Sequence, residues 1–357
     1  MTYSIRVMER TDVAAVGALL RKVYGERSAL YANWDEILEW MYFSPAIADP
    51  APRALVIADQ TSVVGHIGWT VSEFTDGEQR FSVVQTENWA VDPACRVGLL
   101  ALRLMQQAMP DRESAIVIGG SEYTQRIVPK LGFQRRGDVD RYLKVLKPFQ
   151  YLFTSRSGER LARNFGKLMV CMAHSLPRLE KVNGKGSPAA PRAGTNGCHH
   201  GCHSNLRPGE TWAARPGVLR NTVDDGFLNW YQRCPEGRVH VLNFYREGRT
   251  ILGRAAMLIR EGRGKRYANL LNVDAPVDDP TAWGQILNSV ESFLIGKGVT
   301  HINTLASFEP WRQALRAAGY SRVSRFPFWV RDKGNRWAGA SAWHLTLIEG
   351  DLGYLLE

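Results

Sequence analysis

The sequence predicts an α/β fold in two tandem domains, and three observations support that class. A strand-like run over residues 83–91 ends at Asp92-Pro93 and is followed by a helix-like run over residues 99–107. The chain has 357 residues, which is long for one hydrophobic core and suits two domains. Its second half also repeats the order of strands and helices of the first, as an internal duplication would leave it.

The elements of the first half follow from apolar spacing and from turn residues. Thr11-Asp12 supply a helix cap, and Thr75-Asp76-Gly77-Glu78 read as a turn before the strand at residues 83–91. We expect strands over residues 3–7, 53–59, 62–73, 83–91, 115–119, 134–138 and 141–146, and helices over residues 13–23, 34–43, 99–107 and 121–133.

The second half is separated from the first by a connector of different composition. Residues 148–182 read as a basic amphipathic helix, which either binds a membrane surface or packs between the domains. Residues 183–209 are a Gly/Pro/Ala/Ser-rich linker, so the predicted domains are 1–147 and 210–357. We expect helices over residues 224–232, 283–295 and 309–318, and strands over residues 239–246, 250–261, 267–273 and 300–304.

The junction after the strand at residues 83–91 has the properties of an anion site. Arg96-Val97-Gly98 stands at the first turn of the following helix, where unpaired backbone N–H groups and the helix dipole favour phosphate oxygens. Gly98 lets a ligand approach the backbone, and the Arg96 guanidinium can bind a phosphate through two hydrogen bonds.

This junction resembles the pyrophosphate loop of the GNAT acyltransferases, V-x-P-x-x-[QR]-x-x-G-x-[GA]. The match is partial, because Leu99 stands where the first Gly is expected and Gly98 lies one residue early. The positions that agree are Val91, Pro93, Arg96 and Ala101. Residues 121–133, S-E-Y-T-Q-R-I-V-P-K-L-G-F, resemble the next helix of the family and its exit. The resemblance covers about residues 3–147 and, more weakly, 210–332, and it implies in each domain a central mixed, mainly antiparallel sheet flanked by helices.

The resemblance implies an N-acyltransferase that moves an acetyl or other acyl group from acyl-CoA to a primary amine by direct attack. The acceptor would be a small-molecule amine, and a nucleotide-linked amino sugar is one hypothesis for it. The alternative is a non-catalytic acyl-CoA-binding or structural protein with this fold. The residues implied to hold the co-substrate acyl-CoA are Trp89, Ala90, Val91, Arg96, Val97, Gly98, Leu99 and Leu100.

Glu87 stands where many members of the family place a strand carboxylate that deprotonates the amine. In a regular strand its side chain shares a face with Trp89 and Val91, so its exposure to the cleft depends on a bulge. The alternative role is a solvated or salt-bridged strand carboxylate. His66, in the strand at residues 62–73, is the next candidate base, although a histidine in such a strand more often belongs to the core.

The acid that protonates the leaving thiolate in the family is a Tyr four residues before the exit Gly, and here that position is Val128. Tyr123 or Ser121, at the start of the same helix, could take its place, or could serve as packing and cap. A coenzyme A thiolate is a fair leaving group near neutral pH, so loss of a dedicated acid weakens the enzyme hypothesis without excluding it.

The second half lacks the phosphate loop. Its counterpart reads D-A-P-V-D-D-P, in which Asp274, Asp278 and Asp279 would repel a pyrophosphate, so we expect coenzyme A to bind only the first domain. Trp311 and Arg312 are candidates for stacking on and pairing with the acceptor. The alternative for the aromatic residues of this half is its own core.

Charge and composition exclude several classes of function. The formal net charge is +10, but the basic residues are scattered and no zinc-finger or RNP-like motif is present, so we expect no nucleic-acid partner. No apolar run reaches membrane-spanning length and no secretory signal is visible, which predicts a cytoplasmic protein. Five cysteines argue against a disulfide framework. Zinc binding at Cys198-His199-His200-Gly201-Cys202-His203 is an alternative to surface histidines in the linker, and we expect no metal. The oligomeric state stays open.

Overall fold

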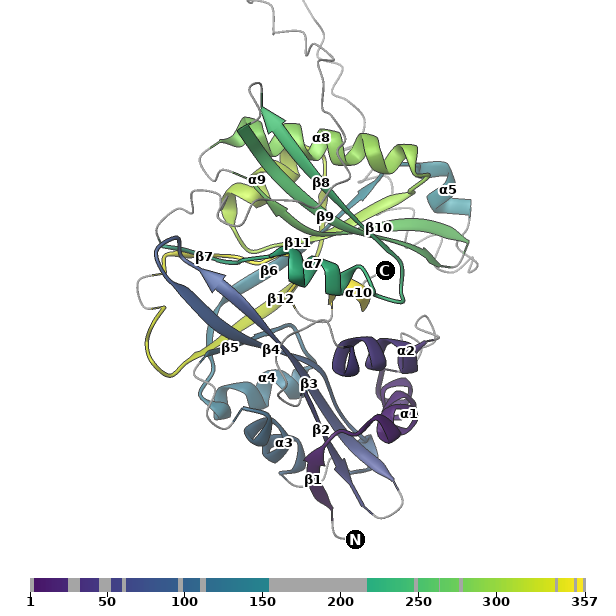
Figure 1. Cartoon of the computed structure of the whole chain (residues 1–357), viewed down its shortest axis with the longest axis vertical. Helices are drawn as coiled ribbons and strands as arrows, with labels where there is room; N and C mark the ends of the chain where they lie inside the picture. Colours follow the sequence, from purple (N-terminus) through teal and green to yellow (C-terminus); the bar gives the residue numbers. More distant parts are fainter. Residues whose placement is uncertain are drawn as a thin grey trace, which may run out of the picture.

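The computed structural model places strands and helices in both halves of the chain (Figure 1). The residues that it describes are 3–24, 33–44, 53–59, 62–95, 99–109, 114–153, 217–246, 250–262, 264–275, 279–337, 340–349 and 352–355. The cysteine- and histidine-rich segment, most of the connector and the turn at residues 96–98 lie outside them.

The described part of the first half contains six strands and the helices that cover them. Its strands are β1 (Ser4–Val7), β2 (Ala54–Ala58), β3 (Val63–Thr75), β4 (Arg80–Val91), β5 (Ser114–Ile118) and β6 (Gln134–Val145). Its helices are η1 (Arg10–Asp12), α1 (Val13–Tyr24), α2 (Trp34–Leu38), η3 (Glu39–Phe43), η4 (Pro93–Cys95), α3 (Leu100–Ala108), α4 (Glu122–Ile127), η5 (Val128–Leu131) and α5 (Pro148–Phe153).

The described part of the second half repeats this order and ends in a short helix. Its strands are β7 (Val218–Asn221), β8 (Arg238–Arg246), β9 (Thr250–Gly262), β10 (Lys265–Asp274), β11 (His301–Ala306), β12 (Ser321–Asp332) and β13 (Ala342–His344). Its helices are α7 (Asp225–Tyr231), α8 (Pro280–Gly296), α9 (Glu309–Ala317) and α10 (Leu352–Leu355).

Three of the expected elements take a different form in the structure, and β7, β12, β13 and α10 were not expected from the sequence. The two strands expected over residues 134–146 are the single strand β6. The helix expected at residues 34–43 changes from α2 into the π-helix η3. The helix expected over residues 121–133 tightens into the 3-10 turn η5 after Ile127, because Pro129 has no N–H to continue the α-helical ladder. Gly132 then closes that turn in the left-handed conformation, with φ 81°.

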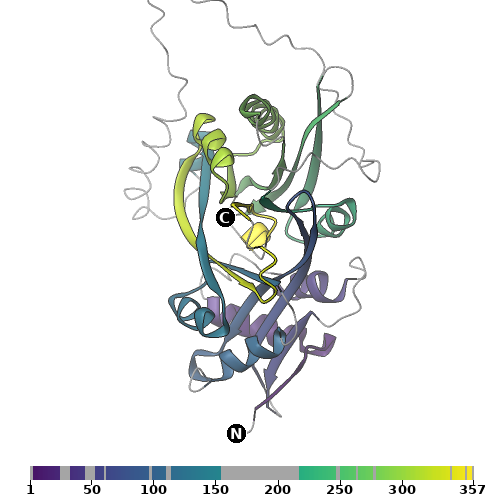
Figure 2. The same cartoon turned by 90° about the vertical axis from the view of Figure 1, so that its left-hand side faces the viewer.

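The two halves share one sheet because each contributes a strand to the other. The strand order is β1-β2-β3-β4-β5-β12-β6-β11-β10-β9-β8. β12, near the end of the chain, pairs antiparallel with β5, for example at Val117 and Trp329. β6, from the first half, pairs antiparallel with β11, for example at Leu143 and Asn303. Figure 2 shows β6 and β12 running together from one half of the molecule into the other. The boundary predicted after residue 147 stays a prediction, and strand pairing crosses it.

Three apolar cores surround this sheet. One core lies between the strands of the first half and the helices α3 and α4, and it includes Leu104 and Val117. A second lies under α8 and α9, and includes Trp283. The largest joins the halves, since it contains Trp34 of α2, Trp230 of α7 and residues of β9, β10 and β12. Trp40 and Trp230 stack there with ring centroids 4.4 Å apart. The face of β3 and β4 that carries this core is therefore the face that meets the second half.

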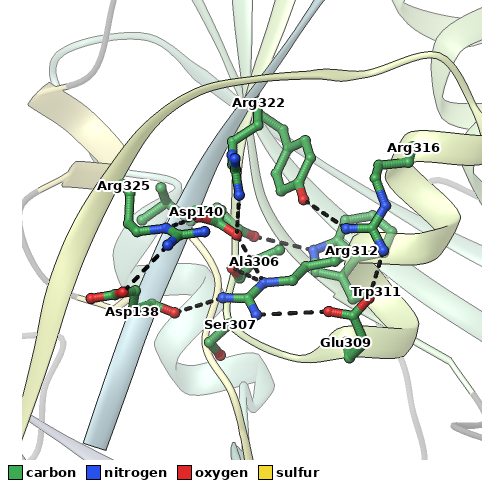
Figure 3. Close-up of polar contacts among 12 residues, drawn as sticks. Asp138, Asp140, Ala306, Ser307, Glu309, Trp311, Arg312, Arg316, Arg322 and Arg325 are labelled. Atoms are coloured by element: carbon green, nitrogen blue, oxygen red, sulfur yellow. Dashed lines mark hydrogen bonds and ion pairs between the residues drawn. The ribbon is translucent and has the colours of Figure 1, made fainter.

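A charged cluster holds the exchanged strands together (Figure 3). Asp140 of β6 is 2% exposed, and its carboxylate accepts a hydrogen bond from Arg325 Nε at 2.8 Å. Arg312 Nε of α9 lies 3.2 Å from the same carboxylate, and Arg312 Nη2 donates to the carbonyl of Asp138 at 2.7 Å. Arg322 lies 3.8 Å from Asp140. The buried carboxylate is thus compensated by cations from β12 and from α9.

Candidate active site

The centre of the candidate site is a β-bulge in β4. Gly65 pairs with Val91 and His66 with Ala90, but Gly68 pairs with Glu87, so two residues of β4 lie opposite one of β3. The extra residue falls at Asn88, whose φ of 50° is rare outside glycine and is tolerated best by Asn and Asp. The bulge on which the exposure of Glu87 depends is therefore present.

The bulge reverses which side chains face which core. Before it, Val83 belongs to the core between the halves and Val84 to the core under α3. After it, Ala90 belongs to the former and Val91 to the latter. Since side chains alternate along a strand, Glu87 lies on the same face as Val83, opposite Val91. Glu87 is 4% exposed, and its Oε1 accepts a hydrogen bond from Thr70 Oγ1 at 2.7 Å.

The side chain of Asn88 connects the bulge to two other elements. Its Nδ2 lies 3.3 Å from the hydroxyl of Tyr42 in η3 and 3.1 Å from the hydroxyl of Tyr354 in α10. Tyr42 also lies directly over Gly68, because a Cβ at Gly68 would stand 1.8 Å from the Tyr42 hydroxyl. A π-helix and a glycine thus bring a tyrosine beside Glu87, which pairs with Gly68.

His66 supports the bulge from β3. Its Nδ1 lies 3.0 Å from the carbonyl oxygen of Asn88, which can only accept, so Nδ1 carries the proton. Burial lowers the pKa of His66 to about 4, and the hydrogen bond to Asn88 opposes part of that effect. The imidazole is therefore neutral near pH 7, with its lone pair on Nε2.

The positions implied to hold acyl-CoA lie at the end of β4 and the start of α3. Trp89 and Leu100 are half-buried, Ala90 and Val91 are buried, and Leu99 is 61% exposed as the residue before α3. No acidic residue stands in the first turn of α3, and no side chain caps it. Arg96, Val97 and Gly98 lie outside the described residues.

β4 and β5 form only a short parallel ladder. The parallel ladder joins Val84 to Ala115 and Gln85 to Ile116, whereas β4 continues to Val91. On its other edge, β5 pairs with β12 over its whole length. The bulge therefore lies beyond the point where the two parallel strands separate, next to the start of α3.

The chain resembles solved structures over both halves. A GCN5-related N-acetyltransferase (GNAT) from Anabaena variabilis matches with a TM-score of 0.55 and 10% identity, over 94% of this chain and 74% of that one. The N-myristoyltransferase of Saccharomyces cerevisiae with bound myristoyl-CoA matches with a TM-score of 0.56 and 11% identity, over 92% and 78%. A putative acetyltransferase from Pyrococcus horikoshii matches with a TM-score of 0.51 and 12% identity, over 92% and 88%.

The chain has a tandem GNAT fold. Neither a protein-family model nor a curated protein matches the sequence. The fold predicted from the two motifs is confirmed, and the matches cover both GNAT-like halves.

The second GNAT-like half has an equivalent bulge in β10. There the register shifts between Leu270 and Asn272, which leaves Leu271 as the extra residue. The parallel ladder from β10 to β11 likewise covers only Ala268–Ile302 and Asn269–Asn303. The two halves thus share the bulge and the separating strands, as a duplication requires.

The C-terminal segment occupies the gap between β10 and β11. Ile348 donates its N–H to the carbonyl of Leu271 at 2.9 Å, so it forms a hydrogen bond with the backbone of the bulge residue. Leu345 donates its N–H to Ser307 Oγ, directly after β11, at 2.8 Å.

The acidic residues of the second half have structural partners. Asp279 caps α8 by accepting a hydrogen bond from the N–H of Ala282 at 3.0 Å. Asp274 forms an ion pair with Arg220 at 2.5 Å. Asp278 lies outside the described residues. The start of α8 is therefore already capped by a carboxylate, whereas the start of α3 is not.

The remaining predicted site residues are on α4 and α9. Tyr123 is 40% exposed on α4, and Ser121 caps that helix by accepting from the N–H of Thr124 at 3.2 Å. Trp311 is fully buried, and its Nε1 donates to the carbonyl of Leu305 at 3.1 Å. Arg312 belongs to the charged cluster around Asp140. Their assignment to catalysis and acceptor binding stays a prediction. The burial of Trp311 argues against a role for that residue in binding the acceptor.

Three residues of the site, Asn88, Tyr42 and Tyr354, are not among those predicted from the sequence. Asn88 had a visible signal, because Asn tolerates positive φ at a strand position that needs a bulge. Tyr42 and Tyr354 had none, since they lie 46 and 266 positions from Asn88. Within the described residues, no group of three or more His, Cys, Asp or Glu side chains could hold a metal ion. No helix of the described part is long and apolar enough to cross a membrane.

Proposed function

We propose that this protein is an acyl-CoA-dependent N-acyltransferase whose reaction takes place at the bulge of β4. The observation that carries the proposal is the position of Glu87, which the bulge turns to the face between the halves. This carboxylate stands beside the point where β4 and β5 separate. A thioester that reached this point along the α3 side would thus meet an amine that entered from the side of the second half.

The start of α3 fits the phosphates of acyl-CoA. Its first-turn N–H groups have no capping side chain and no neighbouring acid among the described residues, so they can donate to phosphate oxygens. Arg96, just before it in the sequence, would add a positive charge. The second half offers no such place, because Asp279 caps α8 and the C-terminal segment fills the gap beside β10. We therefore assign acyl-CoA to the first half, at residues 89–91 and 96–100.

The proposed reaction is direct attack of a primary amine on the thioester. Glu87 accepts the proton of the amine, and Thr70 orients the carboxylate through its hydrogen bond. The nitrogen forms a bond to the carbonyl carbon, the C–S bond breaks, and the thiolate takes the electron pair. Backbone N–H groups of residues 89–91 would stabilise the charge on the carbonyl oxygen. Since a thiol has a pKa of about 8.5, the thiolate needs no dedicated acid to leave.

The acceptor is a small-molecule primary amine in this proposal, and a nucleotide-linked amino sugar remains one hypothesis for its identity. Residues around Glu87 on the acceptor side come from η3 and α10, among them Tyr42 and Tyr354. The predicted cytoplasmic location belongs to the same proposal.

Release of free thiol tests the proposal. The protein is incubated with acyl-CoA of increasing chain length and with a panel of amines that includes amino sugars and their nucleotide-linked forms. We expect one amine class to accelerate thiol release, the acylated amine to appear in equal amount, and Glu87→Gln to suppress both. Glu36→Gln, an exposed carboxylate on α2, is the matched control. Tight acyl-CoA binding without transfer to any amine would instead support the non-catalytic alternative.

A further inference from the structure

A cavity of about 490 Å³ lies at the opposite end of the first half from the proposed acyl-CoA site. Its wall includes Lys130 and Leu131 from η5, Met109 after α3, and Arg331 with Lys333 at the end of β12. Arg331 pairs with Ala115 at the start of β5, whereas the separation of β4 and β5 begins at the other end of that strand. The cavity is therefore separate from the bulge.

The guanidinium of Arg331 is buried in this wall and has no carboxylate partner within the part of the chain that the structure describes. Arg331 is 9% exposed, and its Nη2 donates to the backbone carbonyl of Met109 at 3.2 Å. Among the described residues it forms no ion pair. Burial lowers the pKa of Arg331, because it removes part of the hydration of the charged guanidinium. A guanidinium has five N–H donors, so most of them remain available to a ligand.

The charges of the wall suit an anion with two negative charges. Lys130, Arg331 and Lys333 contribute three positive charges, and Asp332 contributes one negative charge. Asp332 accepts a hydrogen bond from the N–H of Trp337 at 2.8 Å, which holds its carboxylate in place. A phosphate monoester is mainly dianionic at neutral pH, whereas a carboxylate carries a single charge.

We propose that this cavity binds a small organic phosphate. The phosphate pairs with Arg331 through two parallel hydrogen bonds, and Lys130 and Lys333 approach it from the rim. Met109 and Leu131 contact the organic part. The volume lies within the range of small-molecule sites, so it holds more than the phosphate alone. This site is independent of the proposed acyl transfer.

Calorimetric titration of the full chain with phenyl phosphate and with benzoate tests the site, since the two probes share a ring and differ in charge. We expect one phenyl phosphate per chain, bound at least about tenfold more tightly than benzoate, a difference of about 1.4 kcal/mol. Saturating coenzyme A should leave this affinity unchanged. Equal binding of benzoate, or displacement by coenzyme A, would overturn the proposal.

Thermal unfolding of Arg331→Leu separates ligand binding from a structural role. Phosphate at matched ionic strength should raise the melting temperature of the wild type and of the control Arg126→Leu, whose arginine is 79% exposed on α4, but not that of Arg331→Leu. In chloride, Arg331→Leu should melt no lower than the wild type, because an uncompensated buried charge has been removed. A lower melting temperature in chloride with an undiminished phosphate effect would show that Arg331 is only structural.

Lys130→Gln gives a second readout that does not disturb the core, because Lys130 is exposed on η5. We expect it to weaken phenyl phosphate binding by about threefold to tenfold with an unchanged melting temperature in chloride. Unchanged phenyl phosphate affinity in Lys130→Gln would contradict the assigned site even if Arg331→Leu failed to fold.

Discussion

Asn88 and Tyr354 lie 3.1 Å apart, Nδ2 to hydroxyl, although 266 positions separate them in the chain. Asn88 is the residue of the β4 bulge with positive φ, and Tyr354 belongs to the last described helix. The same Tyr354 hydroxyl lies 2.9 Å from the sulfur of Met41. The geometry around Glu87 therefore depends on a contact that the end of the chain provides.

We predict that Tyr354→Phe lowers kcat about tenfold, or about 1.4 kcal/mol, while the KM for acyl-CoA stays within about twofold. The ring still fills the core, but the bulge loses one of its hydrogen bonds. Steady-state kinetics checks this, with Tyr245→Phe as control because Tyr245 is 43% exposed on β8. If kcat is unchanged, the contact between Tyr354 and Asn88 does not help to position Glu87.

Glu87→Gln should reduce turnover most at low pH. There the amine is mostly protonated and needs a base, whereas at high pH the free amine attacks without one. Measurement of kcat between about pH 6 and about pH 10 checks this, with Glu36→Gln beside it. A loss that is equal at every pH would indicate a structural role for the buried carboxylate and its hydrogen bond to Thr70.

Arg96→Ala should weaken acyl-CoA binding by about tenfold, since it removes one charge-assisted contact to a phosphate. Equilibrium titration with acyl-CoA measures this independently of turnover. Arg266→Ala, at the edge of the second half, is the control and should leave the affinity unchanged. If Arg96→Ala bound acyl-CoA with the same affinity as the wild type, the assignment of the phosphates to the start of α3 would be wrong.

Trp311→Ala tests whether Trp311 binds the acceptor or belongs to the core. Its ring packs beside Trp283 with centroids 5.2 Å apart and has no exposed surface. We expect a loss of about 3–5 kcal/mol in the free energy of unfolding, which denaturant titration measures. If stability is retained and the KM for the acceptor rises about tenfold instead, the original acceptor assignment is right and the core assignment is wrong.

Glu349 should make the free energy of unfolding fall as the pH rises. Burial raises its pKa to about 7 from the usual 4.5, against the hydrogen bonds donated by Thr346. Between these two values the folded state keeps a proton that the unfolded state has released, so stability is lost as the pH rises through about 7.

Glu349→Gln removes this titration. Its melting temperature should match that of the wild type at about pH 5 and exceed it at about pH 8. Glu261→Gln is the exposed control and should follow the wild type at both values. A variant that is equally destabilised at both pH values would show that the carboxylate form is needed for packing.

The sequence predicted the elements well, because their periodicity and turn residues are local. The helix after Asp92 and the turn at Gly77, which has φ 101°, are where the patterns placed them. It predicted the face of Glu87 only conditionally, because a bulge depends on the register between β3 and β4.

The strand exchange could not be predicted, and neither could the contacts of Asn88. β6 and β12 are equivalent strands of duplicated halves, so their patterns fit either edge, and only long-range partners, such as Asn303 of β11 for Arg141 of β6, distinguish the two arrangements. Contacts such as that of Asn88 with Tyr354 leave no periodic signal, because each depends on the complete fold.

The exchange of strands also sets the order in which the protein can be completed during synthesis. Ile118 of β5 pairs with Phe328 of β12, which is translated 328 − 118 = 210 residues later. At a translation rate of about 5–20 residues per second, the edge of β5 waits roughly 10–40 s for its partner. β6 is translated soon after β5, but in the folded protein it lies beside β11. The final pairing of the β5 edge can therefore form only after β12 has left the ribosome.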